Sequence, residues 1–573
     1  QRQMCIRDRN IFKKNLTLPC LGIGMMLALN ACGTASQSAS AETITSSSTT
    51  VSGATTSIQV SGDNISINGN GATREGKTIT ISEAGTYELS GTLEEGQIKI
   101  NTDGEVKLIL NNFNISNSTS APIIGKKGNV QILLKENSKN TVSDKRSAKE
   151  ESDSTESEES SETTTDYDAA IYSEGDLLLS GTGSLTVEGG YEDGIHSKTS
   201  LTVESGEYKI TASHHGLNGK KTLTVKDGTF DITTVEDALH SKGDVSVENG
   251  KITVNAGDDA LHADNTLTVK DGTIDIQKSN EGLEGITVNV EGGNISIQSS
   301  DDGINGAGES EDGSAVDISV NISGGNVKIV PGGDGIDSNG DLNVSGGTIV
   351  IDGPSDGGNA PIDYDGTASI TGGTVVASGN SGMFQGFDES SSTQSSVIYY
   401  LSDTANAGDS VKITDSTGKE IYSSSDTTQS FNTILFSSAD LEEGKAYTVS
   451  VGSSSESVTI SGKSNTVGTR SQSLGQPPMN GGFRGNGEGQ NRGGQEQGDD
   501  QNRPPMPPMN GGNAQQGGHG QQGQPPMNGG NAQQGGRSQQ GLPPMNGNKQ
   551  QKKNTKTTNK NSSKSNTKQD NMH

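Results

Sequence analysis

The chain has 573 residues, a net charge of −29, a hydrophobic content of 27% and 80 glycines. Phosphate backbones require a basic surface, so this charge argues against nucleic acid as a partner. The composition also excludes a globular fold over the whole chain, because the chain has no tryptophan and few apolar residues. These residues suffice only for a thin core, and we expect much of the chain to be unstructured.

The N-terminus has the features of a bacterial lipoprotein leader. Lys13 and Lys14 precede an apolar run, Leu16–Leu29, that ends in Leu-Asn-Ala-Cys32. A positive flank, a short apolar stretch and small residues at its end predict a signal peptide, and the run is shorter than the roughly 20 residues of a membrane span. Residues 1–32 are therefore predicted to be the signal peptide, with Cys32 lipidated and anchoring the protein at the extracellular face of the membrane. Plain secretion is the alternative.

Residues 33–57 are rich in Ser and Thr and predict a tether. Short alternating segments separated by Gly or Asn then predict the opening coils of a repeat fold between Ile58 and Val142. A Ser/Glu/Asp run at 145–165 interrupts them, and we expect it to be a disordered acidic loop. With all three cysteines at or before Cys32, no disulfide can staple this body.

A phrase of the form Asp-Gly/Ala-Ile/Leu-His/Asn returns along the next part of the chain. Its apolar residue recurs every 22 residues at Ile195, Leu217, Leu239, Leu261 and Leu283. Each repeat also carries two alternating apolar pairs around a glycine, such as Leu223/Val225 and Phe230/Ile232 around Gly228. This pattern predicts short strands around a sharp corner. The corner glycines are Gly206, Gly228, Gly250, Gly272, Gly293, Gly325, Gly347 and Gly373.

The fixed period predicts an all-β solenoid, a right-handed parallel β-helix with coils of about 22 residues, over residues 58–395. An acidic insertion between Gly306 and Asp317 accounts for one longer repeat. Longer strands at 396–463 predict a small β cap over the C-terminal end. Residues 464–573, rich in Gln, Gly, Pro and Asn with a lysine-rich end, predict a disordered tail.

Stacking the coils in register produces two polar ladders beside the buried Ile/Leu. The first polar ladder, ahead of the apolar residue, comprises Asp193, His215, Asp237, Asp259, Glu281, Asp302 and Asp334. The second polar ladder, after it, comprises His196, Asn218, His240, His262, Glu284, Asn305, Asp337 and Asp363. Residues that flank a buried one in an extended segment point outward, so we expect both ladders on the surface of one face.

Carboxylates stacked about 4.8 Å apart repel one another unless counter-ions neutralise them. Calcium fits best, because it prefers oxygen ligands and tolerates irregular shells; the histidines could instead favour zinc or another transition metal. A structural alternative is that the aspartates only satisfy turn backbone, which explains the doubled acids poorly. The predicted calcium ligands are Asp193, Asp237, Asp258, Asp259, Asp301, Asp302, Asp334 and Asp337.

A third ladder, the lysine ladder of Lys198, Lys220 and Lys242, repeats with the same 22-residue spacing. Ammonium groups beside a carboxylate–calcium face could bind a polyanion with repeated carboxylates, such as a uronic-acid polysaccharide, or could simply neutralise adjacent acids. The predicted carbohydrate contacts are these lysines with His196, His240 and His262.

Several phrases resemble a known family. Gly85-Thr-Tyr-Glu-Leu-Ser-Gly91, the segment from Leu108 to Ile115, Ser120-Ala-Pro-Ile123 and the Asp-Gly-Ile-His repeats are similar to those of the bacterial carbohydrate-binding β-helix family typified by a clostridial cell-surface protein. The resemblance covers about Ile58 to Lys463. It implies a right-handed parallel β-helix with bound calcium, recognition of cellulose or acidic sugars such as polygalacturonate, and kinship in fold with β-helix pectate lyases.

Three functions follow as hypotheses. The first is a non-catalytic, calcium-dependent polysaccharide-binding protein, expected to be a monomer anchored to the membrane through Cys32. The second is a calcium-dependent lyase in which a lysine removes a proton next to a uronate carboxylate. No lysine is distinguished from its repeats, however, so no catalytic residue is predicted. The third is a structural adhesin or wall spacer.

Overall fold

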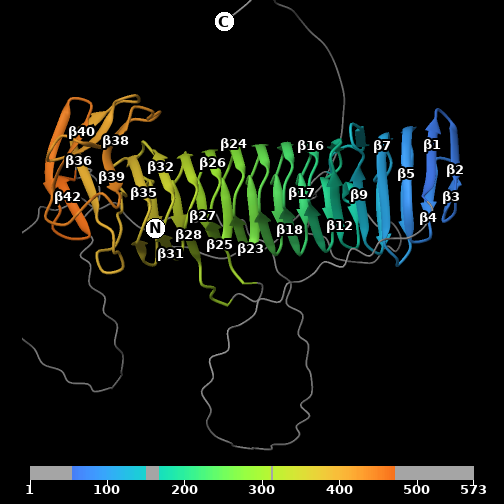
Figure 1. Ribbon diagram of the computed structural model, residues 1–573, viewed down its shortest axis with the longest axis horizontal. Coiled ribbons are helices and arrows are strands. Elements are labelled where there is room, and N and C mark those ends of the chain that lie inside the picture. The colour runs from blue at the N-terminus through green and yellow to red at the C-terminus, as the bar shows by residue number, and fades with distance from the viewer. Residues whose placement is uncertain (1–54, 150–166, 311–313, 471–573) are drawn as a thin grey trace, which may run out of the picture. The chain divides into compact units, whose positions relative to one another are not determined.

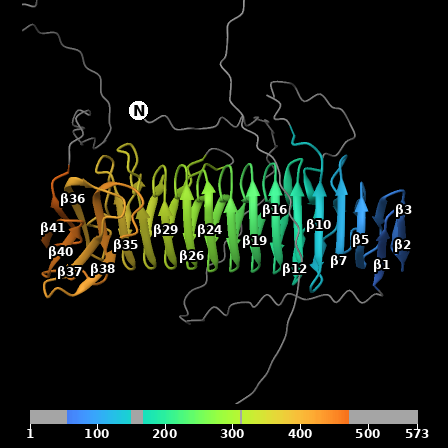
Figure 2. The ribbon, with the colours of Figure 1, turned by 90° about the horizontal axis from the view of Figure 1, so that it is seen from above.

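A computed structural model describes residues 55–149, 167–310 and 314–470. Every regular element in these ranges is a β-strand. The strands stack in a long row from β1 to β35 and end in a smaller group, β36–β42 (Figures 1 and 2). The predicted all-β solenoid is confirmed, with about 12 turns.

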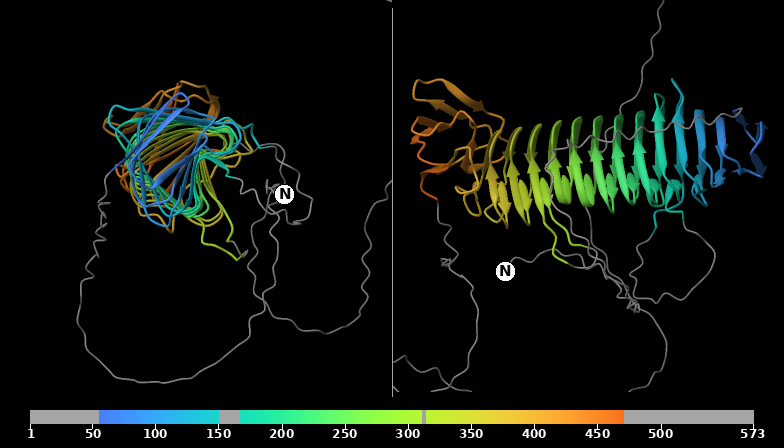
Figure 3. Two further views of the ribbon diagram at one scale, coloured as in Figure 1. Left: turned by 90° about the vertical axis from the view of Figure 1, so that its right-hand side faces the viewer. Right: turned by 60° about the horizontal axis from the view of Figure 1, so that its bottom comes forward.

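Each regular coil contributes one strand to each of three parallel sheets, which superimpose when the stack is viewed from its end (Figure 3). Sheet 1 consists of β4 (Thr78–Ile81), β6 (Gln97–Asn101), β8 (Ile123–Lys127), β11 (Ala169–Ser173), β14 (Asp193–Ser197), β17 (Leu217–Gly219), β20 (Leu239–Ser241), the first part of β23 (Leu261–Val269), the first part of β25 (Leu283–Val290), β27 (Ile304–Gly306), β30 (Ile336–Ser338) and β33 (Ile362–Tyr364). The phrase of the sequence repeat lies at the start of these strands.

Sheets 2 and 3 hold the two alternating apolar pairs of each repeat. Sheet 2 consists of β1 (Thr56–Ser61), β5 (Gly85–Glu94), β7 (Val106–Asn117), β9 (Val130–Leu134), β12 (Leu177–Gly181), β15 (Ser200–Val203), β18 (Thr222–Val225), β21 (Asp244–Val247), the later parts of β23 and β25, β28 (Ser319–Ile322), β31 (Asp341–Val344) and β34 (Ala368–Ile370). Sheet 3 continues from the later parts of β5 and β7 into β10 (Lys139–Asp144), β13 (Ser184–Gly189), β16 (Glu207–Ala212), β19 (Thr229–Thr234), β22 (Lys251–Asn255), β24 (Thr273–Ser279), β26 (Asn294–Ser299), β29 (Asn326–Val330), β32 (Thr348–Asp352) and β35 (Thr374–Gly379).

The interior is a column of stacked aliphatic side chains. Ile195, Leu217, Leu239, Leu261 and Leu283 pair in register along sheet 1, and each is fully buried. In β19 the burial pattern alternates, with Phe230 and Ile232 inside and Asp231 outside. The hydrophobic periodicity of the sequence therefore predicted the core correctly, and burial of this column is the main source of stability.

The corner glycines lie between sheet 2 and sheet 3 and have positive φ angles, for example +117° at Gly250 and +109° at Gly272. A side chain at Gly250 would also contact the carbonyl oxygen of Gly228 on the preceding coil, at 2.9 Å. Both the left-handed backbone and the close stacking favour glycine here, as the sequence pattern predicted.

The longer repeat leaves the stack undisturbed. β27 pairs with β30 in register, Ile304 opposite Ile336, although 32 residues separate them. The extra residues follow β27, and part of them, 311–313, lies outside the described residues, as do the predicted signal peptide, Cys32, most of the tether and most of the acidic loop at 145–165.

The two ends of the solenoid carry antiparallel strands. At the N-terminal end, β2 (Asn64–Asn68) pairs with β1, and β3 (Ala72–Glu75) pairs with β4. The C-terminal strands are β36 (Ser396–Ala405), β37 (Val411–Asp415), β38 (Glu420–Ser424), β39 (Phe431–Ser437), β40 (Ala446–Val451), β41 (Ser454–Thr459) and β42 (Ser464–Gly468).

This C-terminal group forms the predicted cap. β39 pairs with β35, the last strand of sheet 3, and β37, β38, β40 and β41 form a separate antiparallel sheet. The predicted boundary at Lys463 is too early, because β42 pairs with β36 through Gly468. Alternating apolar residues, the signal used for the other strands, are missing from Ser464–Gly468. The rest of the predicted tail, 471–573, lies outside the described residues.

Candidate functional site

The second polar ladder is a true β-ladder on sheet 1. His196 pairs with Asn218, Asn218 with His240, and His240 with His262. The same register continues through Glu284, Asn305, Asp337 and Asp363. The sequence repeat therefore gave the correct relative position of every residue in this ladder.

The first polar ladder lies where the chain enters sheet 1, and one oxygen of each aspartate has a structural role. Asp193 Oδ1 accepts a hydrogen bond from the backbone N–H of His215, 3.1 Å away on the next coil. Asp237 accepts one from the N–H of Asp259, and Asp259 one from the N–H of Glu281. In the same way, Asp302 accepts a hydrogen bond from the N–H of Asp334, and Asp334 accepts one from the N–H of Ala360. The turn-satisfying role considered from the sequence is thus present, but it occupies only one oxygen of each carboxylate.

The expectation that both ladders point outward on the surface is wrong for most of their members. Asp193 is 2% exposed, Asp237 4%, His196 7% and His240 5%. Each aspartate lies at the corner before the strand, and its carboxylate bends toward the backbone of the next coil. Coils above and below then cover the side chains. The strict alternation of an extended segment does not hold at this corner.

The small second residue of the phrase has a packing reason. A Cβ at Gly194 would lie 2.8 Å from Ile210 Cγ2 in the core, and at Gly216 it would lie 2.8 Å from Ile232 Cγ2. These close contacts favour a small residue between the polar corner and the core; where the phrase lacks glycine, alanine occupies the equivalent positions 238 and 260. The phrase therefore encodes a corner, a close contact, a core residue and a ladder residue in that order.

Histidines surround the first aspartates. The Nδ1 atom of His214 lies 2.8 Å from Asp193 Oδ1, and that of His196 lies 3.4 Å from Asp193 Oδ2. Burial alone would raise the pKa of Asp193, but hydrogen bonds from His214 and His215 hold it below its ordinary range. His214 was not predicted as a site residue from the sequence, although it stands directly before His215.

The next aspartate has a similar setting. His240 Nδ1 lies 2.8 Å from Asp237 Oδ2, and the nearly parallel rings of His215 and His240 stack with centroids 4.1 Å apart. Burial opposes ionisation of Asp237, but its hydrogen bond from His240 and the nearby charges of His215 and His262 bring its pKa to about 2. Imidazole and carboxylate alternate here, which makes this part of sheet 1 a mixed nitrogen and oxygen site.

Beyond His262 both ladders carry only oxygen ligands, and this part, called the oxygen-only region, comprises Glu281, Glu284, Asp302, Asn305, Asp334, Asp337 and Asp363. Ligand oxygens of Asp259, Glu281 and Glu284 lie within 4.8 Å of one another. Burial, followed by repulsion from Asp259, raises the pKa of Glu281 to about 7, and burial together with Asp259 raises that of Glu284 to about 10. The nearest imidazole is His262, whose Nδ1 lies 3.2 Å from both Asp259 Oδ2 and Glu284 Oε2, and its charge opposes these shifts without cancelling them.

The same imbalance continues in the following coil. Burial, and then repulsion from Asp334 and Asp301, raises the pKa of Asp302 to about 8 even though the N–H of Asp334 stabilises its ionised form. The Oδ1 atom of Asn305 is buried and has no hydrogen-bond partner within the described part of the chain, while its Nδ2 donates to Glu281 at 2.7 Å. Carboxylates and an amide oxygen without a partner are the donor set that a calcium ion uses.

The predicted calcium ligands thus divide between two environments. Asp193 and Asp237 lie among histidines, Asp259 lies at the border because it contacts His262, and Asp302, Asp334 and Asp337 lie in the oxygen-only region. Asp258 is half-buried and Asp301 is exposed, so the first acid of each doubled pair lies outside the buried row.

A cavity of about 260 Å³ brings the predicted carbohydrate contacts together. It is lined by Lys198, Lys220, Lys242, His196, His240, His214, His215, Asn218, Asp168, Glu192 and Asp193. Of the predicted contacts only His262 is absent from this lining. Lys198 is partly paired, because its Nζ lies 3.6 Å from Glu174 and 5.6 Å from the centre of the Tyr172 ring.

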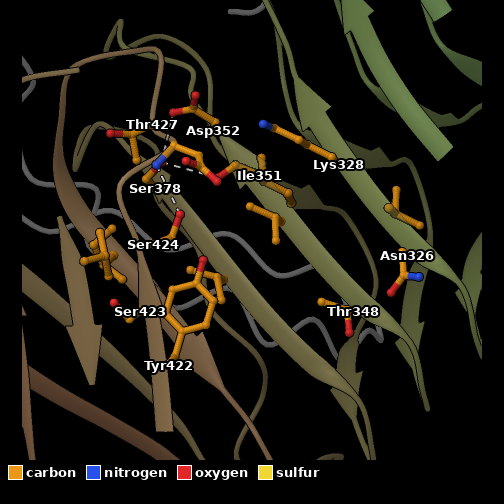
Figure 4. Close-up of a pocket in the computed structure, with 16 residues that line it drawn as sticks. Asn326, Lys328, Thr348, Ile351, Asp352, Ser378, Tyr422, Ser423, Ser424 and Thr427 are labelled. Carbon is orange, nitrogen blue, oxygen red and sulfur yellow. Dashed lines mark hydrogen bonds between the residues drawn. The ribbon is translucent and has the colours of Figure 1, made fainter. Parts of the chain in front are cut away.

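A second cavity, of about 320 Å³, lies where sheet 3 meets the cap (Figure 4). Tyr422 of β38 faces strands of sheet 3 across it, with Lys328 and Asp352 near one end. It is more apolar than the first cavity and contains none of the residues predicted from the sequence.

Among the described residues, no helix is long and apolar enough to cross a membrane.

Comparison with known proteins supports the family resemblance. Residues 75–315 match the model of a family described as "Carbohydrate-binding domain-containing protein". A curated protein of the same description from Acetivibrio thermocellus is 30% identical over 139 residues, which make up 24% of this chain and 46% of that protein. The chain therefore matches about half the length of this curated relative. The family resemblance predicted from the sequence is confirmed in this region.

One solved structure is also similar. It is described as the polysaccharide lyase-like protein from C. thermocellum, in a gadolinium derivative. It is 25% identical, the match covers 51% of this chain and 97% of that one, and the TM-score is 0.33.

Proposed function

We propose that this protein is a non-catalytic polysaccharide-binding protein that binds acidic polymers such as polygalacturonate in the presence of calcium. The family match over residues 75–315 supports carbohydrate binding in general. The observation that carries the choice of an acidic sugar is the cavity in which Lys198, Lys220 and Lys242 lie side by side. Ammonium groups repeated on successive coils suit a polymer whose carboxylates also repeat.

Calcium enters the proposal through the oxygen-only region beside this cavity. Asp259, Glu281 and Glu284 place oxygens within reach of one ion, and Asn305 adds an oxygen that lacks a partner among the described residues. A bound calcium ion would supply the positive charge that ionises these carboxyl groups and could bridge them to a uronate. A polymer lying along sheet 1 would then contact lysines at one part and calcium at the next.

Affinity electrophoresis in a gel that contains polygalacturonate tests this proposal. We expect retardation with calcium and none after chelation by EDTA. Lys220→Glu removes one attraction and adds a repulsion, which costs about 1–2 kcal/mol or roughly 10-fold in affinity. Lys328→Glu makes the same charge change at the second cavity and should leave retardation unchanged. Retardation that survives EDTA, or that is lost equally in both variants, would contradict the proposal.

Related measurements would detect either of the two other functions considered from the sequence. A lyase would generate an unsaturated uronate, detected as rising ultraviolet absorbance when the protein is incubated with polygalacturonate and calcium. A structural adhesin or spacer would show no retardation in gels of any acidic or β-glucan polymer. We expect neither result.

The proposal also includes attachment to the cell surface through Cys32. Labelled palmitate should be incorporated into the protein in its bacterial host, and Cys32→Ser should abolish incorporation. Incorporation that persists in this variant would exclude Cys32 as the lipid anchor.

A further inference from the structure

Every histidine of the described residues lies in one cluster on consecutive coils of the solenoid. Its members are His196, His214, His215, His240 and His262; the other two of the chain's seven histidines, His519 and His573, lie outside the described residues. Ring centroids are 3.8 Å apart for His214 and His215 and 5.3 Å apart for His240 and His262. Stacking of coils does not require imidazole at these positions, since Glu284 and Asn305 occupy the same ladder further along.

Three of these five histidines converge on one carboxylate oxygen. Asp237 Oδ2 lies 2.8 Å from His240 Nδ1, 3.5 Å from His215 Nε2 and 3.6 Å from His262 Nδ1. Ligand atoms that share a tetrahedral zinc ion at about 2.1 Å are separated by about 3.4 Å. The imidazole nitrogens therefore lie near the separations that a shared metal ion would set.

The other oxygen of Asp237 fixes the carboxylate. Its Oδ1 accepts the backbone N–H of Asp259 at 3.1 Å, so the side chain is anchored to the next coil with Oδ2 directed at the histidines. Second contacts of this kind orient the ligands of metal sites.

A second observation concerns another histidine that lines the cavity beside the cluster. The Nε2 atom of His196 is buried and has no hydrogen-bond partner in the described ranges, although His196 lines the cavity with His215 and His240. A buried polar atom left without a partner is costly, and a bound ion or its coordinated water would satisfy it.

We propose that His215, Asp237 and His240 bind a transition-metal ion of the zinc class, at a site distinct from the oxygen-only region. Ligand atoms of these residues lie within 4.8 Å of one another, and all of them are less than a tenth exposed. His262 is the next nearest donor. Imidazole nitrogen favours zinc, nickel or copper over calcium, whereas Asp259, Glu281 and Glu284 supply oxygen ligands, with His262 at the border between the two sets. The ladders would thus bind two classes of cation on neighbouring coils.

Isothermal titration with zinc chloride tests the site. The two tail histidines are first replaced by His519→Gln and His573→Gln, and this chain is the reference. We expect it to bind one zinc ion, with an affinity that His240→Ala lowers at least about 10-fold. Asp302→Asn is the matched control in the oxygen-only region and should leave zinc affinity unchanged.

Further measurements cover the case in which a variant does not fold. If circular dichroism shows that His240→Ala does not fold, His215→Gln replaces it; if neither folds, the visible absorption of bound cobalt(II) in the reference chain reports whether nitrogen ligands are present. Absence of zinc binding by the reference chain, equal loss in Asp302→Asn, or a cobalt spectrum of oxygen ligands only would overturn the proposal.

The result is separable from that of polysaccharide binding. Retardation by polygalacturonate is measured with calcium in zinc-free buffer. Normal retardation without zinc binding would remove only the zinc site, and zinc binding without retardation would remove only the proposed function.

Discussion

At the scale of single residues, the aspartates of the repeated phrase show how one side chain can stabilise the fold and take part in a site. One oxygen of Asp237 accepts the N–H of Asp259 in the next coil, and the other contacts His240. Replacing such an aspartate would disturb both roles at once. Histidines and lysines of the ladders are therefore the better positions for testing binding.

The crowded carboxyl groups predict an unusual pH dependence. The pKa of Glu281 is raised from 4.5 to about 7 and that of Asp302 from 3.8 to about 8. For each group, the folded state holds more protons than the unfolded state at any pH between its ordinary pKa and its raised pKa. Stability must then fall as pH rises through this window. In EDTA, we expect the thermal unfolding midpoint to decrease from about pH 4.5 to about pH 8.

Calcium and substitution provide the controls for this prediction. Calcium should reduce or reverse the decrease, because it binds the ionised carboxylates of the folded state. Glu281→Gln should flatten the profile in EDTA, whereas Glu389→Gln, at an exposed carboxylate before the cap whose pKa is lowered by hydrogen bonds from the N–H groups of Lys463 and Ser464, should not. A midpoint that rises with pH in EDTA would show that these groups are ionised without a cation.

At the scale of the repeated element, replacing a corner glycine should lower the stability of the fold by a measurable amount. Gly250→Ala places a Cβ at a φ of +117° and 2.9 Å from the Gly228 carbonyl oxygen. We expect a loss of about 1–3 kcal/mol in the free energy of unfolding. Gly418→Ala has a positive φ of +87° but no atom within 4 Å of the added Cβ, so it isolates backbone strain from the clash.

Denaturant unfolding of both variants measures the difference. A loss in Gly250→Ala no greater than that in Gly418→Ala would mean that the stacked coils separate easily at this corner, contrary to the close packing described.

Most of the fold at this scale could be predicted from the sequence, because it depends on local periodicity. The alternation around Gly228 gave two strands and a corner, and the 22-residue spacing gave the register of Ile195 with Leu217. The burial of Asp193 could not be predicted, because its carboxylate is directed by the N–H of His215, a partner set only when the next coil has stacked.

The relative placement of the candidate site residues was predictable to the same extent. The lysine ladder was identified from its spacing, and the structure places its members in one cavity. The division of the ladders into a nitrogen region and an oxygen region was less visible, because no single repeat contains it. It appears only when His240 and Glu284, which occupy equivalent positions in different coils, are compared.

At the scale of the whole solenoid, the two ends pose the same physical problem. A stack of parallel strands leaves unpaired N–H and C=O groups at each end, and these can pair with another chain. Here β2 and β3 pair antiparallel at the first coils, and β39 pairs antiparallel with β35 at the last. The cap core, which includes Val376, Phe436 and Tyr399, also covers apolar side chains of the final coil.

Removal of the cap should therefore cause the chain to self-associate. A chain that ends after Gly379 exposes the edge of β35 and the apolar side chain of Val376, which is 5% exposed when the cap is present. We expect this truncation to form larger species in sedimentation velocity at concentrations where the full chain does not. A chain that ends after Arg470 keeps β42 and every other described strand of the cap, and it is the matched control. If the Gly379 truncation sediments like this control, pairing by β39 is not what keeps the last coil from associating, and the closing role of the cap must be abandoned.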